Sequence, residues 1–106
     1  HYLEALAAPR AFLPTEAVGG IRANPTGTWQ THLAAREVYR FLGVEDRIGI
    51  WYRDGLHDHG FVDWCAFLDF ADRQLRGQSN TRRFNVNPFP AMPVAFKWKA
   101  DRSRME

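Results

Sequence analysis

Two short strand-like segments alternate with helical segments along this chain, and this order limits the fold more than any other property of the sequence. Residues 11–15 are short and apolar, and residues 47–53 are rich in β-branched and aromatic side chains. Helical spacing of apolar residues occurs over 29–42 and 61–76. Such alternation predicts an α/β fold, with parallel strands covered by helices. Because two strands cannot bury a sheet, we expect the remaining strands N-terminal to His1 or on another chain.

The ends of the helices are marked by residues that favour helix starts and stops. Asn24 and Pro25 can begin the first long helix, and Gly43 and Gly77 follow the two helices as terminators. A further short helix is predicted within residues 1–10. We expect Trp29 in the core. In the helix over 61–76, the apolar residues share one stripe that we expect to be buried: Phe61, Trp64, Cys65, Leu68, Ala71 and Leu75.

The composition changes after Gly77. Residues 78–106 are polar and then rich in proline, which predicts an extended C-terminal tail after a folded part formed by residues 1–77. We expect this tail to pack through its aromatic side chains, which are Phe84, Phe89, Phe96 and Trp98.

Composition and charge exclude several classes of protein. The chain has 106 residues, is 45% hydrophobic and carries a net charge of +2, which indicates a folded chain rather than a disordered one. With one cysteine, Cys65, it forms no internal disulfide. No stretch approaches the roughly 20 apolar residues that span a membrane. No zinc-finger, RNA-binding or helix-turn-helix signature is present. We therefore expect neither a membrane nor a nucleic-acid partner.

A polar loop over residues 54–60 contains the most informative side chains, His57, Asp58 and His59. Ligands of open α/β sheets bind beyond the carboxyl ends of the strands, where this loop begins. A histidine there suits general-base catalysis, since its ordinary pKa is about 6.5. His57 is the candidate, and an ordinary surface histidine remains the alternative. His59 is expected to cap the next helix or face solvent. Neighbouring residues of an irregular loop rarely converge on a metal, so we expect no metal and no cofactor.

Four segments of the chain carry a family resemblance: Asn24–Trp29, Ala34–Gly43, Arg53–His57 and Asp63–Asp72. Together they resemble the C-terminal portion of glucuronoyl esterases and related bacterial serine α/β-hydrolases, over about residues 5–77. In that fold the catalytic histidine comes last in the chain. By resemblance His57 matches it, whereas the serine nucleophile and an oxyanion arginine lie upstream, outside these residues. Ser79 lacks the Gly-x-Ser-x-Gly context of such a nucleophile.

The chain departs from this family at two loop positions. Many members have an acidic residue at the position of Gly20 and a pocket-lining aromatic residue at the position of Arg22. The triad acid is therefore either Glu16, the acid left in the loop over 16–28, or a residue of an earlier strand outside the chain. A solvent-facing Glu16 is the alternative. The forked guanidinium of Arg22 suits a uronate carboxylate, although a solvated arginine is the alternative.

The resemblance implies a carboxylic-ester hydrolase that acts through an acyl-serine intermediate on glucuronate esters between xylan and lignin, in a secreted or periplasmic protein. Its partners would be the missing N-terminal part of the same domain and a carbohydrate ester substrate, and the chain alone would be inactive. Two alternatives remain: another carbohydrate or acyl esterase on the same fold, and an inactive homologue that binds carbohydrate or protein. A serine elbow upstream would distinguish an enzyme from a binding module.

Overall fold

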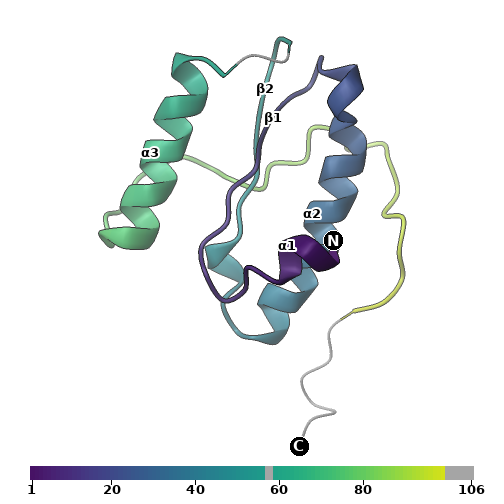
Figure 1. The fold of residues 1–106 in the computed structure, drawn as a ribbon, viewed down its shortest axis with the longest axis horizontal. Coiled ribbons are helices and arrows are strands. Elements are labelled where there is room, and N and C mark those ends of the chain that lie inside the picture. The colour runs from purple at the N-terminus through teal and green to yellow at the C-terminus, as the bar shows by residue number, and fades with distance from the viewer. Residues whose placement is uncertain (57–58, 100–106) are drawn as a thin grey trace, which may run out of the picture.

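Two helices flank a pair of short parallel strands (Figure 1). The structure is a computed structural model that describes residues 1–56 and 59–99. None of its helices in these ranges is long and apolar enough to cross a bilayer. The predicted order of helices and strands and the parallel direction of the strands are confirmed. In chain order the helices and strands are α1 (Tyr2–Ala5), β1 (Thr15–Ala17), α2 (Pro25–Phe41), β2 (Trp51–Arg53) and α3 (Phe61–Leu75).

Strand β1 begins later than the sequence predicted. Its regular pairing with β2 starts at Thr15, which lies opposite Trp51, whereas Phe12 forms only an isolated bridge. Between them, the carbonyl of Pro14 accepts a hydrogen bond from the Trp51 amide at 3.0 Å, but Pro14 has no N–H to donate, so the ladder is interrupted there. The prediction of a strand over 11–15 was therefore wrong in its bounds. Glu16, expected in a loop, lies within β1.

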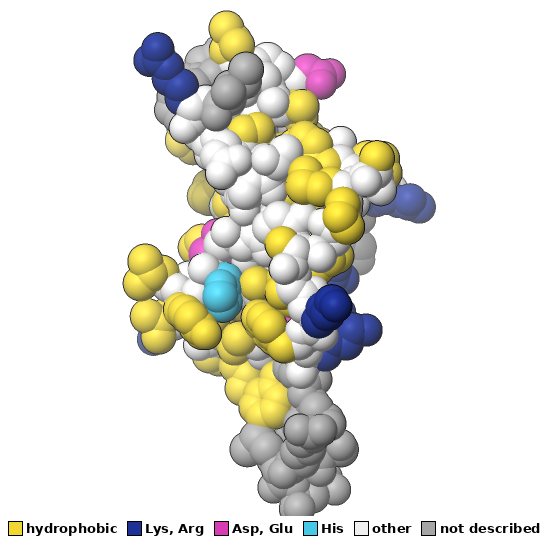
Figure 2. Space-filling model, turned by 90° about the vertical axis from the view of Figure 1, so that its right-hand side faces the viewer, with side chains coloured by type: hydrophobic (Ala, Val, Ile, Leu, Met, Phe, Trp, Pro, Cys, Tyr) yellow, Lys and Arg dark blue, Asp and Glu magenta, His cyan; other side chains and the backbone are white. Residues whose placement is uncertain are grey.

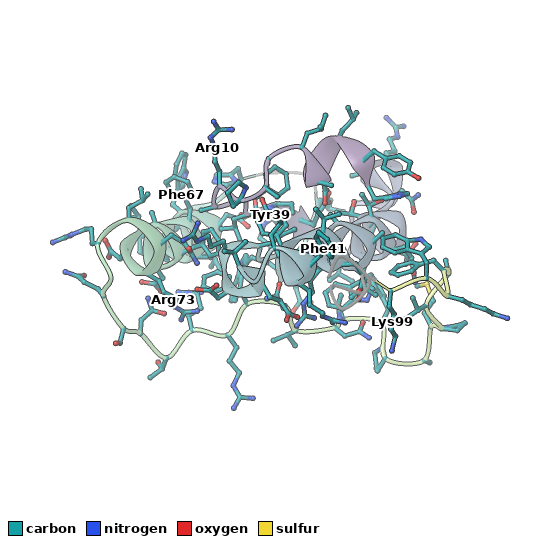
Figure 3. The ribbon with its side chains drawn as sticks, turned by 90° about the horizontal axis from the view of Figure 1, so that it is seen from below. Arg10, Tyr39, Phe41, Phe67, Arg73 and Lys99 are labelled. Carbon is teal, nitrogen blue, oxygen red and sulfur yellow. The ribbon has the colours of Figure 1, made fainter. Side chains whose placement is uncertain are left out.

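Helix α2 begins where the sequence predicted. Asn24 adopts a left-handed conformation and its side chain accepts the Gly27 N–H at 3.1 Å, which caps the helix. Trp29 is buried, as expected. The buried core lies between this helix and the strands, where Ala35 and Tyr39 pack against the residues before β2. The Tyr39 hydroxyl donates to the carbonyl of Arg10 at 2.6 Å, which ties the segment before β1 to the helix (Figure 3).

Helix α3 buries a different side from the predicted one. Its buried residues are Asp63, Ala66 and Phe70, with Phe70 packed against the backbone at Gly49. Several members of the predicted core stripe are instead exposed, with exposed fractions of 82% for Phe61, 54% for Trp64, 56% for Leu68 and 81% for Leu75. The reason is that a two-stranded sheet offers only a narrow surface, so the helix can bury one edge of its apolar face. The expectation that Trp64 is a core residue was wrong for the chain as described.

The C-terminal tail packs along the outer side of β2, as its aromatic residues predicted. The Asn85 N–H donates to the carbonyl of Ile50 at 3.1 Å. The Phe84 ring lies edge-on to Trp51 and Phe70, with centroid distances of 6.1 and 5.2 Å. Figure 2 shows that hydrophobic side chains also reach the surface of the lower half of the molecule, gathered beside a histidine.

His32 is an unexpected buried polar residue of α2. It is 0% exposed, and its ring lies 5.5 Å from that of Trp29. Neither ring nitrogen has a hydrogen-bond partner among the described residues. Burial, reinforced by the charge of Arg36, lowers the pKa of His32 to about 4, although the nearby Asn85 side chain opposes the shift. Its position three residues after Trp29, on the buried face of the helix, was the sequence signal for this burial.

The free energy of unfolding is expected to decrease as the pH is lowered from 6.5 to about 4. The pKa of His32 is 6.5 when unfolded and about 4 when folded, so the unfolded state takes up the proton first. The contribution of this pKa difference to the free energy of unfolding is fully present above pH 6.5. It is lost progressively as the pH falls to 4, and the total loss is about 3 kcal/mol. Urea unfolding at several pH values measures this loss. His32→Leu should remove it, and an unchanged pH dependence in that variant would contradict the assignment.

Candidate active site

The carboxyl ends of the two strands bring two loops side by side. Beyond the regular ladder, the Val18 N–H donates to the carbonyl of Arg53 at 2.9 Å, and the Gly19 N–H donates to the carbonyl of Gly55 at 3.1 Å. A Cβ atom at Gly19 would lie 2.5 Å from that Gly55 oxygen, so only glycine permits this approach. The loop after β1 and the predicted histidine loop over 54–60 therefore start next to each other, at the end of a parallel sheet where ligands bind.

A buried ion pair holds the two ends of the histidine loop. At the end of β2, Arg53 donates through Nε to Oδ2 of Asp63 at 2.5 Å. The same carboxylate oxygen accepts the N–H of Gly60, the residue before α3, at 3.0 Å. A further guanidinium nitrogen of Arg53 donates to the carbonyl of Leu56 at 2.8 Å. One arginine and one aspartate thus fix where the loop leaves the strand and where it enters the helix.

Sequence reasoning did not identify Arg53 and Asp63 as site residues. The Asp63 side chain is almost fully buried, and that of Arg53 is mostly buried. The available signal was the position of Asp63, three residues after Gly60, from which a carboxylate reaches back to the amide before a helix. Their burial depends on how α3 packs on β2, which the local sequence does not show.

Of the three polar residues of the loop, His57, Asp58 and His59, the structure describes only His59. His57 and Asp58 lie outside the described residues, so the role of His57 stays a prediction. His59 is exposed, which agrees with the predicted solvent-facing position, one of the two alternatives for this residue. Its ring lies edge-on to that of Trp64, with centroids 4.6 Å apart. The predicted capping role of His59 was wrong, because the Asp63 side chain accepts the amide before α3.

Glu16 lies on the side of β1 that faces α2. Its Oε1 accepts a hydrogen bond from the Thr28 hydroxyl at 3.1 Å, in the first turn of that helix. The residue opposite it in β2, Tyr52, donates its hydroxyl to the carbonyl of Pro25 at 2.6 Å. Burial and the charge of Glu16 raise the pKa of Tyr52 far above its usual value, so the phenol stays a neutral donor. Glu16 is thus held in place near the strand end, and its role as triad acid stays a prediction.

The two loop positions that depart from the family also lie near this strand end. Gly20 is buried, and a Cβ atom there would lie only 3.3 Å from the carbonyl oxygen of Ala17. This tight turn explains why glycine suits the position in this chain. Arg22 is exposed, on a short 3-10 helix over Ile21–Ala23. Its guanidinium is accessible to a carboxylate ligand, and its predicted role stays a prediction.

A hollow of about 510 Å³ adjoins the histidine loop. Residues from both strand ends, the start of α3 and the tail line it together: Val18, Trp51, Tyr52, Arg53, Asp54, Val62, Val86 and Pro88. Its wall therefore includes the residues on both sides of the loop over 54–60. The described part of the chain offers this concave surface at the end of the sheet where the fold positions its functional loops.

Comparison with known proteins identifies relatives of this chain, although no protein-family model matches it. It is 34% identical over 92 residues to the carbohydrate esterase MZ0003 from an unknown prokaryotic organism, a match that covers 73% of this chain and 21% of that protein. Its structure is similar to that of a carbohydrate esterase family 15 glucuronoyl esterase from Caldicellulosiruptor kristjansonii, with a TM-score of 0.86 and 42% sequence identity. That match covers 92% of this chain and 26% of the solved one.

These matches place the chain among the relatives of carbohydrate esterases, a class of hydrolases. Within that class, the structural match over nearly the whole chain is to a glucuronoyl esterase, which confirms the resemblance found in the sequence. The chain spans about a fifth of the length of the curated relative and about a quarter of the solved structure.

Proposed function

We propose that this chain is the histidine-bearing part of a serine carboxylic-ester hydrolase of the α/β-hydrolase type, which cleaves glucuronate esters between xylan and lignin. The observation that carries the proposal is the placement of the loop over 54–60. It leaves the carboxyl end of a parallel strand, and Arg53 and Asp63 hold both of its ends. The names of the two relatives support the reaction class, and the name of the solved structure supports glucuronate as the acyl group.

In this mechanism His57 acts as the general base. It accepts the proton of a serine hydroxyl supplied by the part of the enzyme outside these residues, while the serine oxygen attacks the ester carbonyl. The protonated histidine then donates that proton to the departing alcohol. In the second half of the reaction His57 takes a proton from water, whose oxygen attacks the carbonyl carbon of the acyl-serine. The protonated histidine then returns the proton to the serine oxygen as the bond between that oxygen and the carbonyl carbon breaks, and the free acid is released. Glu16 is the candidate for the acid that orients the imidazole. Arg22 is the candidate for a residue that binds the uronate, whose carboxylate is free only in the acid product.

We expect the full-length protein to hydrolyse benzyl glucuronate and the 106-residue chain to show no turnover above background, since the described chain offers no serine elbow. Matched assays should use the methyl esters of glucuronate and galacturonate, aryl acetates and acetylated xylan. A serine-directed inhibitor should abolish the glucuronate activity.

The substrate series separates this proposal from its alternatives. Preference for acetylated xylan would indicate another esterase on the same fold. Absence of turnover in a well-folded full-length protein would indicate an inactive homologue. Inhibitor-sensitive turnover by the 106-residue chain itself would contradict the assignment of the nucleophile to another part of the enzyme.

A further inference from the structure

A second hollow lies between α2 and the C-terminal tail. The tail crosses the helix at Gln30, whose side-chain amide donates to the carbonyl of Pro93 at 3.1 Å and whose side-chain oxygen accepts the Ala95 N–H at 2.9 Å. Beyond this crossing, helix and tail bound a hollow of about 410 Å³. Its volume falls within the roughly 300–1,000 Å³ of small-molecule sites.

Two aromatic rings of the tail form one wall of this hollow. Phe96 and Trp98 are stacked, with their centroids 4.9 Å apart and their planes at 29°. Trp98 stays 43% exposed, although the His1 ring lies 5.8 Å from it. An aromatic side chain of this kind combines a large apolar face with a polar edge, and such residues are common in ligand sites that also contain a few polar groups.

Basic side chains surround these rings. They come from both walls and are Arg36 and Arg40 of α2 and Lys97 and Lys99 of the tail. One carboxylate, that of Glu37, also lines the hollow, but it pairs with Arg40 at 2.9 Å and its side chain is only 8% exposed. Neither lysine takes part in an ion pair within residues 1–56 and 59–99. The hollow therefore combines an aromatic wall with an excess of positive charge.

The hollow lies at the end of α2 that is farther from the histidine loop. In the first turn of the helix, Thr28 donates to Glu16 near the carboxyl end of β1. In its last turns, Tyr39 packs against Ile48, which precedes β2. Arg40 and the hollow beside it thus lie toward the amino ends of the strands. A ligand bound there leaves the candidate active site free.

The hollow also lies away from the side on which a longer domain can continue the sheet. On the outer edge of β2, the Asn85 N–H already donates to the carbonyl of Ile50 at 3.1 Å, which leaves the β1 edge for further strands. Figure 3 shows Lys99 and Arg73 on the side where the tail runs, and Arg10, which leads into β1, on the opposite side. The hollow is therefore accessible to a ligand in the longer protein.

We propose that this hollow is a second carbohydrate site, which binds a segment of an acidic polysaccharide with a sugar ring against Trp98 and a free uronate carboxylate against Lys97 and Lys99. An ammonium group and a carboxylate form charge-assisted hydrogen bonds, which a neutral sugar does not offer. The choice of ligand rests on the proposed function, because a glucuronate-bearing polymer carries free carboxylates wherever the ester is absent. The hollow and its charge do not depend on that function.

Binding measurements on the full-length protein test the ligand class without reference to turnover. We expect de-esterified glucuronoxylan to bind at least about 10-fold more tightly than xylan from which the uronates have been removed, and the difference should shrink as salt is added. Equal affinity for the two polymers would overturn the proposal. Tighter binding of a single-stranded oligonucleotide than of glucuronoxylan would overturn it too, because the site would then be one for nucleic acid.

Variants of the tail locate the site. Trp98→Ala should weaken binding of glucuronoxylan at least about fivefold, and Trp98→Phe should restore most of the affinity. Lys99→Gln should weaken it at least about threefold, whereas Arg83→Gln should have little effect. Arg83 is the matched control, because it is also an exposed basic residue of the tail but lines a different hollow. Equal losses in Lys99→Gln and Arg83→Gln would show that the charge acts diffusely, and unchanged binding in Trp98→Ala would show that the ring is not used; either result overturns the site.

Turnover separates this site from the candidate active site. Trp98→Ala should keep kcat/KM for benzyl glucuronate within about twofold and lower kcat/KM for esterified glucuronoxylan at least about threefold, because only the polymer reaches both sites. Equal losses with the two substrates would overturn a separate site. If the full-length protein hydrolyses no glucuronate ester, the proposed function fails, and the binding measurements still decide whether the hollow binds the acidic polymer.

Discussion

Replacing His57 with alanine in the full-length protein is expected to reduce ester hydrolysis about 10⁴-fold, because loss of the proton acceptor leaves only substrate binding and stabilisation of the oxyanion. The reduction should appear in kcat, with a smaller change in KM, since the histidine acts on the reacting serine rather than on the bound sugar. Steady-state rates with benzyl glucuronate, measured at equal folded fractions, check this result.

His59→Ala is the matched control, since the two histidines belong to the same loop. The described ring of His59 is exposed and packs edge-on against Trp64. Because Asp63 and not His59 accepts the amide before α3, we expect this variant to keep its rate within about threefold and to lose less than about 1 kcal/mol of stability. An active His57→Ala together with an inactive His59→Ala would reverse the assignment. Full activity in both would argue against a histidine-dependent hydrolase.

The order of helices and strands was predictable because its signals are local. The Asn24 cap, the proline after it and the apolar spacing around Trp29 each act within one or two helical turns, and the structure retains all of them. The start of β1 was less predictable. Its apolar run begins at Ala11, but Pro14 interrupts the hydrogen-bond ladder because it has no N–H. The sequence does not show on which side of Pro14 the neighbouring strand lies, and this side decides whether the missing N–H matters.

The buried side of α3 could not be predicted from its sequence alone. The helix has a wide apolar face, and its spacing does not tell which part of that face meets the strands of this chain. The structure buries Phe70 and leaves Leu68 half exposed. The same reason explains why His32 and Asp63 were missed: each is a polar residue whose burial depends on contacts with distant segments.

Removing the Asp63 carboxylate is expected to destabilise the protein by about 4 kcal/mol, because breaking a buried ion pair costs more than the pair contributes. Asp63 is 1% exposed and binds both Arg53 and the Gly60 amide. Asp63→Ala loses both bonds, whereas Asp63→Asn can still accept from Gly60 and should cost less. Urea unfolding of the full-length variants measures these losses.

Asp72 provides the control on the same helix. It pairs with Arg76 at 3.5 Å on the surface, so Asp72→Ala should cost less than about 1 kcal/mol. Because Asp63 fixes the helix end of the histidine loop, Asp63→Asn should also lower kcat at matched folded fraction while KM changes little, and Asp72→Ala should change neither. Equal effects of the two alanine variants on stability would mean that the Arg53–Asp63 pair does not hold the loop. A destabilised Asp63→Asn with unchanged kcat would limit the role of the pair to folding.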